Sequence, residues 1–154
     1  MAYDLLIVGS GPGGYVAAIR ASQLNMKVGI IEKESLGGIC LNWGCIPTKT
    51  LLKSAQVYDY VKHAKDYGIN VSDHSIDFKG MIQRSRGAAD NMSKGVNFLM
   101  KKNKIDIIEG HGRLTSDKKV EVENEQGEKT IHEGNNILIA TGGRANQRPH
   151  IPVD

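Results

Sequence analysis

The sequence predicts an α/β fold with a central parallel sheet, flanking helices and a small antiparallel β-meander. An apolar segment over residues 3–8 runs directly into a glycine-rich turn, 9–14. A helical pattern of small residues follows over 15–24, and a second buried strand is expected over 27–31. This strand–helix–strand order within about 30 residues is a βαβ unit, whose strands are parallel. Later segments alternate apolar and polar residues, as antiparallel strands do.

The glycine-rich turn has the spacing Gly-x-Gly-x-x-Gly of a dinucleotide-binding loop. Gly9 permits the tight turn, Gly11 lets the backbone approach a pyrophosphate, and Gly14 allows the helix to pack closely on the strand. Glu32 ends the second strand, where an acidic side chain accepts hydrogen bonds from a ribose 2′-hydroxyl. We therefore predict a Rossmann-like dinucleotide site. A turn in another α/β fold and a solvated acid at Glu32 are the alternatives.

Both cysteines, Cys40 and Cys45, lie in a segment rich in glycine. Residues five apart on a regular helix point to different faces, so a bridge would need an irregular turn, for which Gly44 supplies backbone freedom. Pro47 suits the first turn of a helix that starts there. The helix dipole and the Lys49 cation would then favour thiolate over thiol. We predict a reacting dithiol; two unreactive buried cysteines or a zinc site are the alternatives.

Two helices are expected after the cysteines. The first covers about 47–66 and ends at Gly68, and a polar connection over 69–75 leads to the second, over about 77–103. The apolar side of the first helix is assigned to the core: Leu51, Leu52, Ala55, Tyr58 and Ala64. Three glycines should make the second helix irregular or broken: Gly80, Gly87 and Gly95. Its apolar side is assigned to the core as well: Phe78, Met81, Ile82, Ala88, Ala89, Met92, Val96, Leu99 and Met100.

The chain then returns to strands. A buried strand is expected over 105–109, and residues 119–123 and 129–132 alternate apolar and polar side chains, as in a short antiparallel meander. The last apolar strand covers 136–140. Residues 144–154 are polar and contain two prolines, so they are expected to lead out of the domain.

Composition narrows the possible functions. With 40% hydrophobic and 24% charged residues, the 154-residue chain fits one soluble globular domain, and a net charge of +3 is too small to predict a nucleic-acid or membrane partner. No window offers the roughly 20 apolar residues of a membrane helix, and no secretory signal is visible. We expect a reducing compartment: the bacterial cytoplasm, or the mitochondrial matrix after removal of a transit peptide. The five histidines have no metal-ligand spacing, so no metal is expected; His111 lies between two glycines that suit either a ligand or a turn.

Five features occur in an order that resembles the FAD-containing pyridine nucleotide-disulfide oxidoreductases: the glycine loop 9–14, Glu32, the segment LGGICLNWGCIPTK over 36–49, Gly-His-Gly over 110–112, and Ala-Thr-Gly over 140–142. The similarity covers nearly the whole chain. Within that family, the cysteine segment is most similar to the branch that oxidises dihydrolipoamide. Glutathione and mercuric reductases, which usually carry valines around the same cysteines, are the alternative, together with a non-catalytic flavin-binding fragment.

The resemblance implies that electrons pass from protein-bound dihydrolipoyl groups to a Cys40–Cys45 disulfide, then to FAD and NAD. Cys40 would be the interchange thiol and Cys45 the thiolate in charge-transfer contact with the flavin, with Lys49 beside the ring. The FAD ribose would bind Glu32, and the adenine the backbone near Gly112. The residues implied to bind FAD are Gly9, Ser10, Gly11, Pro12, Gly13, Gly14, Glu32, Lys33, Gly37, Gly38, Ile39, Cys40, Cys45, Lys49, His111, Gly112, Ala140, Thr141 and Gly142.

The sequence departs from the family pattern in three ways. Ile39 stands where many relatives have threonine and Gly143 where many have serine, so hydroxyl contacts are not carried over there. The family also needs an NAD domain, a late FAD-contacting segment and an interface domain with a His–Glu pair. We therefore expect 1–143 to be an incomplete FAD-binding domain and 144–154 a connection toward an NAD-binding domain. As the N-terminal portion of a homodimeric enzyme that serves the lipoyl domains of 2-oxo-acid dehydrogenase complexes, the chain should bind FAD weakly and be inactive alone.

Overall fold

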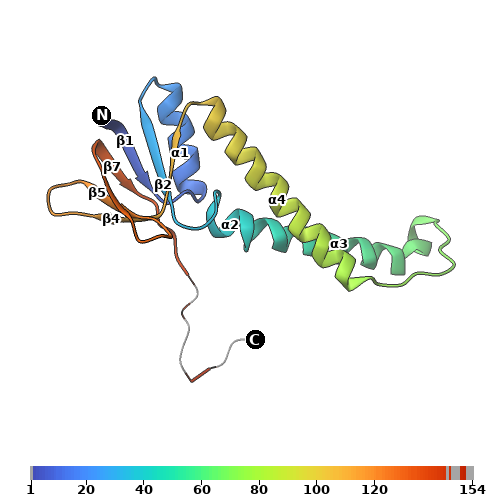
Figure 1. Ribbon diagram of the computed structural model, residues 1–154. Helices are drawn as coiled ribbons and strands as arrows, with labels where there is room; N and C mark the ends of the chain where they lie inside the picture. Colours follow the sequence, from blue (N-terminus) through green and yellow to red (C-terminus); the bar gives the residue numbers. More distant parts are fainter. Residues whose placement is uncertain (1, 145, 147–149, 152–154) are drawn as a thin grey trace.

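The computed structural model describes residues 2–144, 146, 150 and 151 (Figure 1). The central sheet contains β1 (Tyr3–Val8), β2 (Val28–Glu32), β3 (Asp106–Glu109) and β7 (Gly134–Ile139), and helix α1 (Pro12–Gln23) packs against one of its faces. The four strands are parallel, in the order β3-β2-β1-β7, and α1 links β1 to β2. The predicted α/β fold with a parallel sheet is therefore confirmed. Most of the expected connection over 144–154 lies outside the described residues.

A second, three-stranded antiparallel sheet has the order β4-β5-β6. It contains β4 (His111–Leu114), β5 (Val120–Glu123) and β6 (Lys129–His132). The meander was predicted from β5 and β6, but β4 was not, since it shows little alternation and holds Gly112. The prediction of a buried strand at β3 was wrong, because β3 is an edge strand with exposed or half-buried side chains.

The central sheet buries a different apolar cluster on each face. Successive side chains of a strand point to opposite faces, so Ile7 of β1 packs with residues of α1 and the later helices, such as Ala18 and Met100. Leu6 packs on the other face with Val120 and other residues of the second sheet. Strand β1 is therefore covered on both sides, which fits its continuous apolar sequence.

Four helical segments complete the structure: α2 (Gly38–Asn42), α3 (Cys45–Lys62), a 3-10 helix (Ala64–Tyr67) and α4 (Phe78–Lys102). Figure 1 shows α3 and α4 side by side, extending away from the sheets as an arm. Helix α4 is continuous, so the expectation that its glycines break it was wrong. Its start is capped by the Asp77 carboxylate, which accepts a hydrogen bond from the Gly80 N–H at 2.9 Å. A glycine inside a helix costs about 1 kcal/mol, which packing against α3 can offset.

The core assignments for these helices were wrong at several positions. Of the five residues assigned to the core of the first helix, only Ala64, which lies in the 3-10 helix, is buried; Leu51 and Tyr58 are half-buried, and Leu52 and Ala55 are exposed. In α4, Ala89, Val96 and Met100 are buried, as predicted. Four residues of its predicted core are exposed instead: Phe78, Ile82, Met92 and Leu99. The sheets cover only the base of the arm, so its outer part lacks a further layer (Figure 1).

Among the described residues, no helix combines the length and the apolar character needed to cross a membrane.

Candidate functional site

A cavity of about 650 Å³ opens beyond the carboxyl ends of β1, β2 and β7. This edge is where open parallel sheets bind ligands. The cavity is lined by residues 8–12, 31–34, 38–40, 43–45, 110–112 and 140–144. It therefore brings together the glycine loop, the end of β2, both cysteines and the residues that follow β7.

Two glycines of the loop, Gly9 and Gly14, pack too closely to admit side chains. A Cβ atom on Gly14 would collide with the carbonyl oxygen of Gly9, and a Cβ on Gly9, whose φ is +100°, would meet the Ala140 backbone. Helix α1 starts at Pro12 on the cavity wall, and no side chain of the described residues caps it. Pro12 has no N–H, and the Gly14 N–H donates to the Gly11 carbonyl at 2.8 Å. Among the described residues of this first turn, the Gly13 N–H is therefore left for an anion, which the helix dipole also favours.

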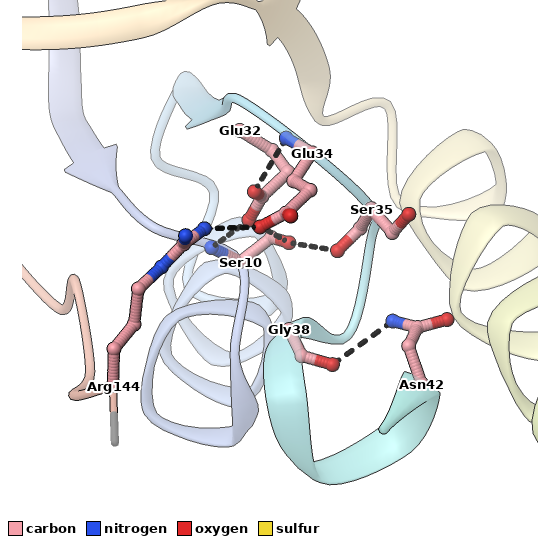
Figure 2. Close-up of polar contacts among 7 residues, drawn as sticks. All are labelled: Ser10, Glu32, Glu34, Ser35, Gly38, Asn42 and Arg144. Carbon is pink, nitrogen blue, oxygen red and sulfur yellow. Dashed lines mark hydrogen bonds and ion pairs between the residues drawn. The ribbon is translucent and has the colours of Figure 1, made fainter. Parts of the chain in front are cut away.

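The Glu32 carboxylate is held in one orientation by backbone and side-chain donors (Figure 2). The buried Ser10 donates to Glu32 Oε2 from its backbone N–H at 3.0 Å and from its hydroxyl at 2.6 Å. The Glu34 N–H donates to Glu32 Oε1 at 2.9 Å. An ionised carboxylate has about four lone-pair sites, so Glu32 retains acceptor capacity toward the cavity. A preset acceptor of this kind fits the hydroxyls of a ribose.

One ion pair crosses the rim of the cavity. Arg144 Nη2 lies 2.6 Å from Glu34 Oε2, which joins the segment after β7 to the segment after β2 (Figure 2). The two side chains are 62% and 46% exposed, so the pair contributes little to stability. Neither residue was predicted at the site. Arg144 falls in the segment assigned to a connection, and Glu34 has no motif around it.

The two cysteines form a disulfide with their Cα atoms 4.6 Å apart. Helix α2 carries Cys40 and ends at Asn42; after an interruption at Trp43 and Gly44, Cys45 is the first residue of α3. The predicted irregular turn is therefore a break between two helices, and the predicted helix N-terminus is at Cys45. Cys40 is half-buried and Cys45 exposed, and both line the cavity.

The cavity gathers most of the predicted binding residues, but four do not line it: Gly13, Gly14, Gly37 and Lys49. Gly14 and Gly37 are buried and shape the loops behind the wall, where the Gly37 N–H donates to the Ser10 carbonyl at 3.1 Å. Lys49 is exposed one turn along α3 from Cys45. The lining residues that sequence reasoning missed are Val8, Ile31, Glu34, Trp43, Gly44, Gly110, Gly143 and Arg144. No set of three or more His, Cys, Asp or Glu residues in the described ranges could hold a metal.

Comparison with known proteins finds matches among disulfide oxidoreductases. The family model described as pyridine nucleotide-disulphide oxidoreductase matches residues 3–153. A dihydrolipoyl dehydrogenase from Zymomonas mobilis is 50% identical over 152 residues, 99% of this chain and 33% of that protein. A mitochondrial dihydrolipoyl dehydrogenase from Arabidopsis thaliana is 44% identical over 153 residues, 98% of this chain and 30% of that protein. The chain thus spans about a third of the length of these relatives.

A solved structure shares the fold. The crystal structure of LpdA from Mycobacterium tuberculosis superposes with a TM-score of 0.90 at 24% identity, covering 97% of this chain and 34% of that one. At this identity, the likeness supports the architecture of the two sheets and the helical arm.

Proposed function

The chain belongs to the pyridine nucleotide-disulphide oxidoreductase family, and on that premise we propose that it is the FAD-binding and disulfide-bearing part of a dihydrolipoyl dehydrogenase. The observation that carries the proposal is the Cys40–Cys45 disulfide on the wall of a cavity that also contains the glycine loop and Glu32. The whole reaction, oxidation of protein-bound dihydrolipoyl groups with reduction of NAD, would require an NAD site and an acid–base pair beyond these 154 residues. The chain alone is proposed to be inactive.

The cavity has the features that FAD requires, with residues 1–143 as the proposed binding domain. The N-terminus of α1, with the Gly13 N–H, would hold the pyrophosphate, and the open space beside Gly11 leaves room for it. Glu32 would accept the adenosine ribose hydroxyls, and the backbone at Gly112 would face the adenine. The flavin would lie toward the cysteines, where Lys49 would contribute its positive charge. When bound, FAD would supply the electron acceptor for the dithiol.

The cysteines perform the thiol chemistry. We propose that a substrate thiolate attacks the Cys40 sulfur, forming a mixed disulfide and releasing Cys45 as a thiolate. The second substrate thiolate then attacks the substrate sulfur of that mixed disulfide, which closes the substrate disulfide and releases Cys40. The substrate loses two electrons and two protons: the protein disulfide gains the electrons, one proton passes to the released Cys40 and the other passes to solvent. Cys45, at the first position of α3, gains from the helix dipole, which stabilises a thiolate.

The proposed partners and cellular location follow from the proposed dihydrolipoyl dehydrogenase function. Lipoyl domains of 2-oxo-acid dehydrogenase complexes would deliver the dithiol, and the complete enzyme would be a homodimer. The relatives include bacterial and mitochondrial proteins. A reducing compartment, the bacterial cytoplasm or the mitochondrial matrix, is proposed for this chain.

Visible spectroscopy and thiol trapping test the proposal. The purified chain, supplied with FAD, should turn yellow and gain a long-wavelength band on two-electron reduction. Dihydrolipoamide should open the Cys40–Cys45 disulfide faster than glutathione does at equal thiol concentration. A colourless protein that rejects added FAD would refute cofactor binding by this chain. Preferential opening by glutathione would refute the proposed substrate.

Replacing Glu32 should weaken FAD binding. In Glu32→Gln, the carboxylate that would accept the ribose hydroxyls is lost, and hydrogen bonds to charged groups contribute roughly 1.5–3 kcal/mol. We expect about a 10- to 100-fold increase in the Kd for FAD, measured by fluorescence titration. Glu34→Gln, on the more exposed neighbouring carboxylate, is the matched control and should change the Kd less than about threefold. Equal effects of the two variants would contradict the role of Glu32.

A further inference from the structure

We propose that Asn42, Ser93 and Arg86 are positioning residues of the disulfide, through which α4 holds α2 and its Cys40 beside Cys45. The inference rests on the proposed function, because it concerns the same disulfide. Asn42 lies within the cysteine segment but has no role in the proposed thiol exchange. Ser93 and Arg86 lie on a different helix, far along the chain.

Asn42 closes the short helix α2 on itself. It is the last residue of α2 and lies between the two cysteines, immediately before the break. Its amide nitrogen Nδ2 donates to the Gly38 carbonyl at 2.9 Å (Figure 2) and to the Leu36 carbonyl at 3.1 Å. Both carbonyls belong to the entry of α2. The Asn42 side chain therefore ties the end of this five-residue helix to its beginning, and Cys40 lies within the closed segment.

Ser93 of α4 fixes the orientation of that amide. Its hydroxyl lies 2.8 Å from Asn42 Oδ1 and 3.3 Å from the Leu36 carbonyl. A hydroxyl has one proton to donate, and the nearer acceptor is the amide oxygen. With Oδ1 facing Ser93, the NH₂ group is directed to the two carbonyls. Both side chains are half-buried, where such a bond is stronger than in water.

Arg86 supplies a second link from the same helix. Its Nη1 donates to the backbone carbonyl of Asn42 at 2.9 Å. This carbonyl ends α2, where the last carbonyls of a helix have no partner within the helix. Arg86 and Ser93 are seven residues apart, which is about two helical turns, so they lie on the same face of α4. Helix α4 thus makes two polar links to α2, one to a side chain and one to the backbone, beside the apolar packing of Leu41 with Val96 and Met100.

This arrangement should favour the disulfide over the dithiol. Closing the bond requires the two Cα atoms to be near their observed separation of 4.6 Å, and the backbone between α2 and α3 passes through the non-helical residues Trp43 and Gly44. In the reduced protein no S–S bond holds Cys40 beside Cys45, so the contacts of α2 help to determine how often the thiols meet. Loosening α2 should therefore shift the equilibrium toward the dithiol.

The test measures that equilibrium directly. The 154-residue chain, without added FAD, is equilibrated at a series of ratios of reduced to oxidised dithiothreitol and quenched with a thiol-trapping reagent. Each turn of the reaction opens the protein disulfide, oxidises one dithiothreitol to its cyclic disulfide and leaves two protein thiols. For Asn42→Ala and Ser93→Ala we expect about a 3- to 10-fold shift toward the dithiol, equivalent to about 15–30 mV. Because the two residues share one contact, the double variant should shift by less than the product of the two single effects.

Ser22→Ala is the matched control. Its hydroxyl donates to the carbonyl of Asn103, the residue that follows the C-terminal end of α4, at 2.5 Å. Its loss therefore removes a comparable hydrogen bond between α1 and α4 and leaves the contacts of α2 unchanged. Ser93→Thr, which keeps a hydroxyl, should restore the wild-type equilibrium. The inference is overturned if Asn42→Ala and Ser93→Ala leave the equilibrium within twofold of wild type, or if Ser22→Ala shifts it equally. A wild-type chain whose disulfide never exchanges with dithiothreitol would overturn the proposed function as well.

Discussion

Cys45→Ser should abolish the long-wavelength absorption band of the reduced, FAD-loaded chain. Cys40→Ser should keep the band and display it before any reductant is added. The reason is the proposed division of roles, in which the Cys45 thiolate at the start of α3 faces the flavin and Cys40 exchanges with substrate. With Cys40 replaced, Cys45 has no disulfide partner and remains free to ionise at the helix N-terminus.

The measurement is a visible spectrum of each variant across a pH series, with FAD content determined from the protein-bound flavin. Serine is close in size to cysteine, so both variants should retain the fold and the cofactor. The band of Cys40→Ser should grow with pH as the Cys45 thiol ionises. If both variants keep the band, or both lose it while retaining FAD, the assignment of the two roles is wrong.

Gly14→Ala should strongly destabilise the fold. A Cβ at Gly14 would collide with the carbonyl oxygen of Gly9, and this contact joins the end of β1 to the first turn of α1. Both partners belong to the packed backbone, and neither can move without shifting the loop. Overpacking of this kind costs typically 1–3 kcal/mol, and a backbone collision falls at or above the top of that range, about 3 kcal/mol or more.

Gly13→Ala provides the control within the same turn. A Cβ at Gly13 meets nothing within 4 Å, and alanine has a better helix propensity than glycine. Its free energy of unfolding, from urea denaturation, should therefore equal or slightly exceed that of wild type. The prediction fails if the two variants have the same stability, because the collision would then be relieved at no cost.

The parts of the site that could be predicted from the sequence are those encoded by short-range patterns. The glycine spacing, Glu32 at the end of β2 and the two cysteines each depend on neighbours in the chain. Ser93 could not be found in this way, because its partner Asn42 is 51 residues away and α4 offers several polar residues on its surface. Arg144 was missed for a related reason, since it meets Glu34 across 110 residues.

The fold shows the same division. Apolar runs identified β1 and β2, because both faces of the sheet are covered, and a helical pattern of small residues identified α1. In α3 and α4, the same kind of period suggested buried faces, yet Leu52 and Phe78 are 64% and 67% exposed. An apolar stripe indicates that one side of a helix can pack against another element, but it does not indicate how much of the helix that element covers. That information comes only from the three-dimensional arrangement of the arm.

The arm also divides the chain into regions with different freedom to change. Its base, where Arg86 and Ser93 meet α2, is tied to the geometry of the cysteines. Its tip, the exposed connection over residues 69–77 between the 3-10 helix and α4, lies far from the sheets (Figure 1). Over evolutionary time, insertions and deletions at such a tip would be tolerated, while the base would drift slowly. The same arm would thus combine a base whose residues are constrained by the disulfide with a tip whose length and sequence can vary between lineages.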